Sequence, residues 1–98
     1  MDRRQEGRLA VELLGSLTSI GHRPVCVQVS QVSANGCRVS GEDLDLHPGD
    51  RVEIDFAGLG HMPADVQWAR EDAAGVRFAA SLHPAILQYL ATFIRLAG

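Results

Sequence analysis

Residues 25–40, Val-Cys-Val-Gln-Val-Ser-Gln-Val-Ser-Ala-Asn-Gly-Cys-Arg-Val-Ser, decide the fold class. Valine alternates with other residues over 25–30, which is the period of a strand with one buried face, and the β-branched content favours a strand. Ser-Ala-Asn-Gly then supplies a turn, and residues 37–40 have the pattern of a returning strand. The stretch predicts a β-hairpin, and therefore an antiparallel sheet.

The same alternation recurs on both sides of the hairpin. Further strands are predicted at residues 9–13, 51–56, 61–70 and 76–78, with turns at 15–21, 47–50, 58–60 and 71–75. Pro63 falls inside one of these strands and predicts an edge position or a bulge there.

The period changes to that of a helix after Ser81. Pro84 suits a first helical turn, and apolar residues then recur on one face, so a helix is predicted over 83–96. Six short strands and one terminal helix predict an all-β fold, a small antiparallel barrel over residues 9–80 capped by a C-terminal α-helix.

Composition restricts the class of protein. The 98 residues fit one domain, 1–98, and 46% apolar with 21% charged residues is typical of a soluble globular protein. We find no apolar window long enough for membrane insertion and no apolar core of a secretory signal after the charged start, so we expect a cytoplasmic protein. The net charge of −3 and the five aromatic residues disfavour DNA or RNA binding.

The potential metal ligands and reactive groups give little support to an enzyme. Cys26 and Cys37 are far apart and are expected to be reduced, small buried residues of strands. The four histidines show no metal-like spacing, and no nucleophile–base pairing is visible, so we expect neither a metal nor catalysis. The acidic run at 42–55 is interpreted as a solvated face.

Three strand residues have side chains that could serve either the fold or a ligand. Arg38 and Arg77 lie between apolar neighbours and are expected to point outward into solvent, although either could reach a ligand on the barrel wall. Trp68 is expected in the core rather than as a stacking platform.

Two segments carry side chains suited to a ligand: Arg-Arg-Gln-Glu-Gly-Arg at 3–8 and Gln-Val-Ser-Ala-Asn-Gly at 31–36. All basic residues of the chain are arginines, whose planar fork matches phosphates and the O6/N7 edge of guanine. The turn adds an amide and a hydroxyl that can accept from a base, and a glycine that allows positive φ or close backbone approach.

Together these segments resemble the two signatures of the PilZ family. The first signature is two arginines separated by three residues, and the second is Asp or Asn, any residue, Ser, two residues, Gly. The matching residues are Arg4 and Arg8, with Arg3 as an additional arginine, and Ser33 and Gly36, whereas Gln31 stands where the family has Asp or Asn. The resemblance covers nearly the whole chain.

The resemblance implies a six-stranded PilZ-type barrel and a bacterial, non-enzymatic receptor for the second messenger cyclic di-GMP. Residues 1–8 would be a flexible segment that becomes ordered around the ligand. The implied ligand-binding residues are Arg3, Arg4, Arg8, Gln31, Ser33 and Gly36. Protein partners in motility, secretion or exopolysaccharide production are implied as well.

An alternative keeps the fold and changes the function. Because Gln31 replaces Asp or Asn, the chain could be a PilZ-like protein-interaction domain that binds cyclic di-GMP weakly or not at all.

Overall fold

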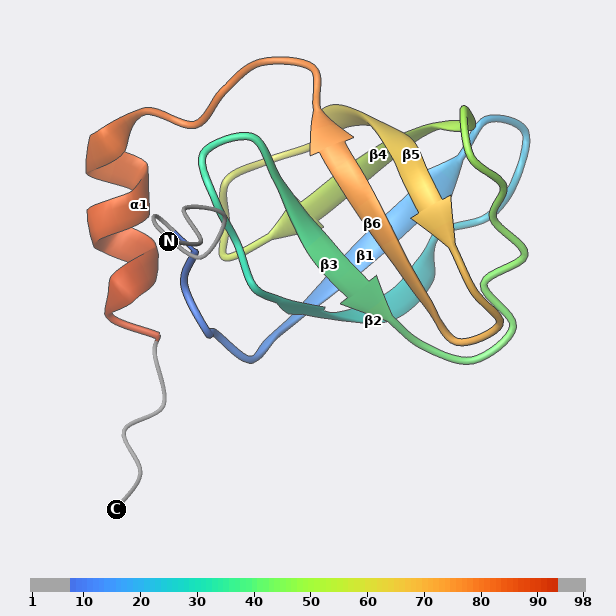
Figure 1. Ribbon diagram of the computed structural model, residues 1–98, viewed down its shortest axis with the longest axis horizontal. Coiled ribbons are helices and arrows are strands. Elements are labelled where there is room, and N and C mark those ends of the chain that lie inside the picture. The colour runs from blue at the N-terminus through green and yellow to red at the C-terminus, as the bar shows by residue number, and fades with distance from the viewer. Residues whose placement is uncertain (1–7, 94–98) are drawn as a thin grey trace, which may run out of the picture.

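The computed structural model describes residues 8–93. Its elements are β1 (Leu13–Ser19), β2 (Val25–Ser30), β3 (Gly36–Ser40), β4 (Arg51–Phe56), β5 (Met62–Ala69), β6 (Ala73–Phe78) and α1 (Pro84–Ala91). The strands are antiparallel and close into a barrel in the order β1-β2-β3-β6-β5-β4, with β4 paired to β1 (Figure 1). The predicted fold, an antiparallel barrel with a C-terminal helix, is confirmed.

The hairpin of β2 and β3 follows its alternation. Val27, Val29 and Val39 are buried inside the barrel, and Val29 pairs with Val39 across the two strands. Gln28 and Arg38 take the outward positions and are exposed. One face of this hairpin therefore builds the core, and the other is available to solvent or a ligand.

The first strand lies later in the chain than predicted. The prediction of a strand at 9–13 and a turn at 15–21 is wrong, because β1 runs from Leu13 to Ser19. Gly15 and its neighbours pair with both β2 and β4, so ladder hydrogen bonds on two sides outweigh their weak strand propensity. A Cβ on Gly15 would lie 2.7 Å from the carbonyl oxygen of Asp55, so only glycine allows this close approach.

Pro63 is not at an edge. It lies within β5 opposite Glu53, and β5 is paired on both sides. The register shift of β5 falls between Val66 and Trp68 instead. The bulge is thus displaced toward the other end of the strand, where it re-aims the side chains that follow it.

The helix α1 is shorter than the predicted 83–96. His83 is its N-cap, and the Nδ1 atom accepts a hydrogen bond from the Ala85 N–H at 3.0 Å. At the other end, the Thr92 N–H and hydroxyl both donate to the Tyr89 carbonyl, which closes the helix at Ala91. Residues 94–96 of the predicted helix lie outside the described residues.

The two ends of the barrel are covered differently. Helix α1 lies at one end of the barrel (Figure 1). Leu90 is fully buried, and the Tyr89 hydroxyl donates to the Ala57 carbonyl at 3.0 Å. Leu44 and Leu46, in the connection from β3 to β4, are buried in the same core.

In the described part of the chain, no helix has the length and apolarity to cross a bilayer.

Candidate functional site

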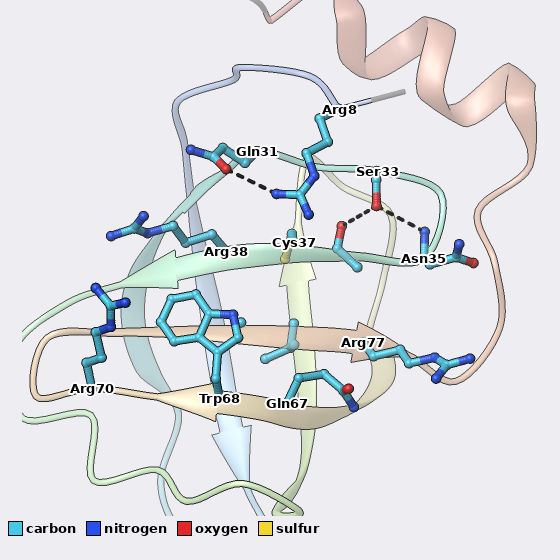
Figure 2. A pocket seen from close by; sticks show the side chains of 13 residues that line it. Arg8, Gln31, Ser33, Asn35, Cys37, Arg38, Gln67, Trp68, Arg70 and Arg77 are labelled. Atoms are coloured by element: carbon cyan, nitrogen blue, oxygen red, sulfur yellow. Dashed lines mark hydrogen bonds between the residues drawn. The ribbon is translucent and has the colours of Figure 1, made fainter. Parts of the chain in front are cut away.

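A hollow of about 560 Å³ lies on the outer wall of β3, β5 and β6, beside the turn from β2 to β3 (Figure 2). This volume is in the range of about 300–1,000 Å³ found for small-molecule sites. The lining residues are Arg8, Gln31, Ser33, Asn35, Gly36, Cys37, Arg38, Gln67, Trp68, Arg70, Gly75, Val76 and Arg77. Four of the six predicted site residues are therefore brought together here.

The N-terminal segment reaches the hollow through one bridge. The Leu9 N–H donates to the Val32 carbonyl at 2.7 Å, and the Val32 N–H donates back to the Leu9 carbonyl at 3.0 Å. This pair brings Arg8 to the rim, where its Nη1 donates to Gln31 Oε1 at 3.4 Å (Figure 2). Arg3 and Arg4, the other predicted arginines, lie outside the described residues.

The turn at 31–36 is held by its own hydrogen bonds. The Ser33 N–H donates to the Gly36 carbonyl at 2.8 Å. The Ser33 hydroxyl accepts from the Asn35 N–H at 3.3 Å and donates to the Gly36 carbonyl at 3.4 Å. Ser33 thus lines the hollow and stabilises the turn that presents it.

The same turn is tied to the connection between β6 and α1. The Asn35 carbonyl accepts from the Phe78 N–H at 2.8 Å, and Asn35 Oδ1 accepts from the Ser81 hydroxyl at 2.7 Å. The Ala34 carbonyl accepts from the Leu82 N–H at 2.8 Å. A displacement of the turn would therefore act on the segment that leads into the helix.

Gly36 and Gln31 meet the backbone requirements of the turn in different ways. Gly36 opens β3, and a Cβ there would collide with the Val76 carbonyl oxygen of β6, so close approach of two strands requires glycine. Gln31 has φ +50, a left-handed conformation in which Asn and Asp are several-fold enriched and other side chains are strained.

Trp68 is not a core residue, contrary to the prediction. Its side chain lies on the outer wall and is 37% exposed. Gly75 pairs with Arg38 on one side and with Trp68 on the other, and the indole lies across it where a Cβ would stand. The Cζ atoms of Arg38 and Arg70 lie 5.7 and 5.3 Å from a Trp68 ring centroid, within the range of cation–π contacts (Figure 2).

The hollow is strongly basic in a chain of negative net charge. Four of the nine basic residues of the chain line it, namely Arg8, Arg38, Arg70 and Arg77. Its lining residues, all within 8–93, include no carboxylate. Such a surface attracts an anion, and guanidinium groups can bind phosphates or purine edges there.

Sequence reasoning missed part of this wall. Arg38 and Arg77 are exposed, as expected, but both line the hollow, and Gln67, Trp68 and Arg70 join them. Gly75 was predicted in a turn at 71–75, which is wrong, because β6 begins at Ala73 and Gly75 lies within it. A glycine within a strand marks close approach, in this case by an aromatic ring from the paired strand.

The two cysteines differ in environment. Cys37 is buried as predicted, and desolvation raises the pKa of its thiol to about 12, so it stays protonated and unreactive near neutral pH. The same prediction is wrong for Cys26, which is exposed on β2. Among residues 8–93, no group of three His, Cys, Asp or Glu side chains is arranged to hold a metal ion.

Comparison with known proteins bears on the family and the fold. Residues 2–96 match the family model described as the PilZ domain. A search of curated proteins finds no match. Among solved structures, the Bacillus subtilis inhibitor of motility MotI/DgrA is similar with a TM-score of 0.71 and 16% identity, over 96% of this chain and 50% of that one. The described chain thus spans about half the length of that protein, and the likeness at this identity concerns the fold.

Proposed function

This chain belongs to the PilZ domain family, and from that premise we propose that it is a non-enzymatic receptor for cyclic di-GMP. The observation that carries the proposal is the basic hollow, in which Arg8 of one signature meets Gln31 and Ser33 of the other. Members of this family bind cyclic di-GMP and act on protein partners, so a binding role agrees with the family.

The charge of the hollow suits a dinucleotide with two phosphates. Each guanidinium–phosphate hydrogen bond is charge-assisted and contributes about 1.5–3 kcal/mol. Because the lining residues within 8–93 include no carboxylate, no described acidic side chain in the hollow competes for the arginines. Among residues 8–93, the anion would therefore gain attraction without displacing an ion pair of these arginines.

The two purine bases find partners of two kinds. Gln31 and the Ser33 hydroxyl would hydrogen-bond one base at the turn, and Trp68 offers an exposed ring on which a base can stack. Arg38 and Arg70 already flank that ring and can bind phosphate or a guanine edge. The wall thus adds residues to the two signature motifs.

Signalling would follow from ordering the segment before Leu9. We propose that residues 1–8, including Arg3 and Arg4, fold over the bound ligand, and that residues 1–98 act as one cytoplasmic domain. The ligand must bind the ordered state more tightly for this to work as a switch. The hydrogen bonds from Ala34 and Asn35 to Leu82 and Ser81 would transmit a shift of the turn toward α1.

Titration calorimetry of the intact chain with cyclic di-GMP tests the proposal, with Arg8→Ala as the variant and Arg23→Ala as the control. Both changes remove one exposed arginine. Arg23 lies between β1 and β2 and does not line the hollow, so it controls for the loss of charge alone. We expect Arg8→Ala to weaken binding about tenfold, the loss of about one charge-assisted bond, and Arg23→Ala to leave it unchanged. Equal effects of the two variants, or no binding by the wild type at high micromolar ligand, would refute the proposal.

A second candidate function is a protein-interaction domain that does not depend on the dinucleotide. The observation in its favour is Gln31, which departs from the family signature and adopts a strained φ. The structural neighbour is an inhibitor of motility, so motility proteins are one class of partner to test, beside secretion and exopolysaccharide proteins. If the immobilised chain retains the same amount of such a partner with and without cyclic di-GMP, the result would favour this candidate.

A further inference from the structure

Resting on the proposed function, we further propose that the turn at Gln31 accepts adenine as well as guanine. The hollow would then bind a mixed guanine–adenine cyclic dinucleotide in addition to cyclic di-GMP. The proposal starts from what the lining offers to a base: amides, a hydroxyl and guanidinium groups, with no carboxylate among the described residues.

Of the three amide side chains in the lining, Gln31 is the one that lies in the turn and also contacts Arg8. Asn35 Oδ1 is bound to the Ser81 hydroxyl at 2.7 Å, and Gln67 lies across the hollow on β5 (Figure 2). Gln31 Oε1 faces Arg8, one of the two arginines that match the first signature. A base that reaches the turn therefore meets the amide of Gln31 first.

A carboxylate and an amide select bases differently. A carboxylate offers two acceptors, which match the adjacent N1–H and 2-amino donors of guanine. Adenine instead presents a donor, the 6-amino group, next to an acceptor, a ring nitrogen. Opposite a carboxylate, the lone pair of that ring nitrogen would face a lone pair of a carboxylate oxygen, and the two would repel. An amide carries one donor group and one acceptor, so it pairs with adenine N6 and N7, and turned over it pairs with guanine O6 and N1–H.

The Gln31 amide can turn over in this protein. Its terminal torsion has a soft, roughly two-fold profile, and its side chain is exposed. The bond from Arg8 is 3.4 Å long, beyond the usual 2.7–3.2 Å range for such bonds. A base can thus take the place of Arg8 at small cost. It would bond the amide oxygen and the amide NH2 group in either orientation of the amide.

The arginines keep one of the two base positions for guanine. Arginine donates in a bidentate way to guanine O6 and N7, whereas adenine has an amino donor in place of O6. Arg38 and Arg70 flank the Trp68 ring; Arg38 pairs with Ser30, next to Gln31, whereas Arg70 lies at the far side of the ring from the turn (Figure 2). A ligand with guanine at the arginines and adenine at Gln31 satisfies both positions, and a ligand with two adenines satisfies one.

The test is calorimetry of the intact chain with three ligands: cyclic di-GMP, cyclic di-AMP and the mixed dinucleotide with the same phosphodiester linkages. We expect the wild type to bind the mixed ligand within about tenfold of cyclic di-GMP and cyclic di-AMP more weakly than either. Gln31→Asp should increase the preference for cyclic di-GMP over the mixed ligand about 5- to 150-fold, the value of one bidentate base contact. Gln28→Asp is the matched control, since Gln28 lies on β2 outside the hollow.

The outcomes separate this inference from the proposed function. A wild type that binds cyclic di-GMP but prefers it over the mixed ligand by a hundredfold or more refutes the inference alone. An unchanged preference in Gln31→Asp, or the same change in Gln28→Asp, also refutes it, because base choice would then not depend on Gln31. Failure of all three ligands to bind folded wild type and folded Gln31→Asp refutes both proposals.

Discussion

The turn at 31–36 and the outer wall of β3, β5 and β6 form two sides of one hollow, but they are stabilised differently. In the turn, Ser33 and Asn35 are fixed by hydrogen bonds to the backbone and to Ser81. On the wall, the Trp68 indole lies across Gly75 and makes cation–π contacts with Arg38 and Arg70 at the surface. Shape at the turn is therefore coupled to the stability of the fold, whereas chemistry on the wall can change with little effect on stability.

The largest effect is expected at the turn, for Gly36→Ala. The added Cβ would collide with the Val76 carbonyl, so β3 and β6 would have to separate, at a cost of about 3 kcal/mol in the free energy of unfolding. Urea denaturation measures this change. A midpoint within error of wild type would show that the turn is no more rigid than the wall.

On the wall, Trp68→Ala should weaken cyclic di-GMP binding about 5- to 150-fold, because stacking contributes about 1–3 kcal/mol per base. The ring is more than a third exposed, so the unfolding midpoint should change less than in Gly36→Ala. Trp68→Phe, which keeps an aromatic face, should retain most of the affinity. If Trp68→Ala destabilises the fold as much as Gly36→Ala does, the distinction between the two regions fails.

Cys37 marks the boundary between the inside of the barrel and this wall, and its titration gives a pH dependence. Its pKa in the folded protein is raised by burial from 9.0 to about 12, so the unfolded state loses the proton first. The stability from the neutral thiol is present below pH 9 and declines by about 1.4 kcal/mol per pH unit between 9 and 12. Urea midpoints at pH 8 and pH 10 should show this decline in the wild type and a smaller one in Cys37→Ala.

The smallest effect is expected for Gln31→Asn. Asn adopts the left-handed conformation more readily than Gln, so at φ +50 the change should stabilise the fold by about 0.5–1 kcal/mol. Thermal denaturation without ligand measures it, and Gln28→Asn, in the regular part of β2, serves as the control. Destabilisation would indicate that the contact between Gln31 and Arg8 contributes more than the backbone strain costs.

The predictability of the two regions from sequence differed for the same physical reason. The hairpin of β2 and β3 and the strand β4 were predicted correctly because they depend on local alternation and turn chemistry, as in Val27 and Val29. The start of β1 depends on a partner distant in the sequence, namely β4, which pairs with Gly15. Trp68 is placed on the outside because the register shift between Val66 and Trp68, set by pairing with β6, breaks the alternation that predicted it in the core. Single-sequence periodicity contains no information about such partners.

The location of Trp68 also has a practical consequence. The chain contains a single tryptophan, and it lies in the hollow beside two guanidinium groups. Its fluorescence emission therefore reports on one place in the molecule. A purine stacked on the indole would exclude water from the exposed face and quench the emission. The unlabelled protein is thus its own optical sensor, with which ligands can be screened at concentrations too low for calorimetry.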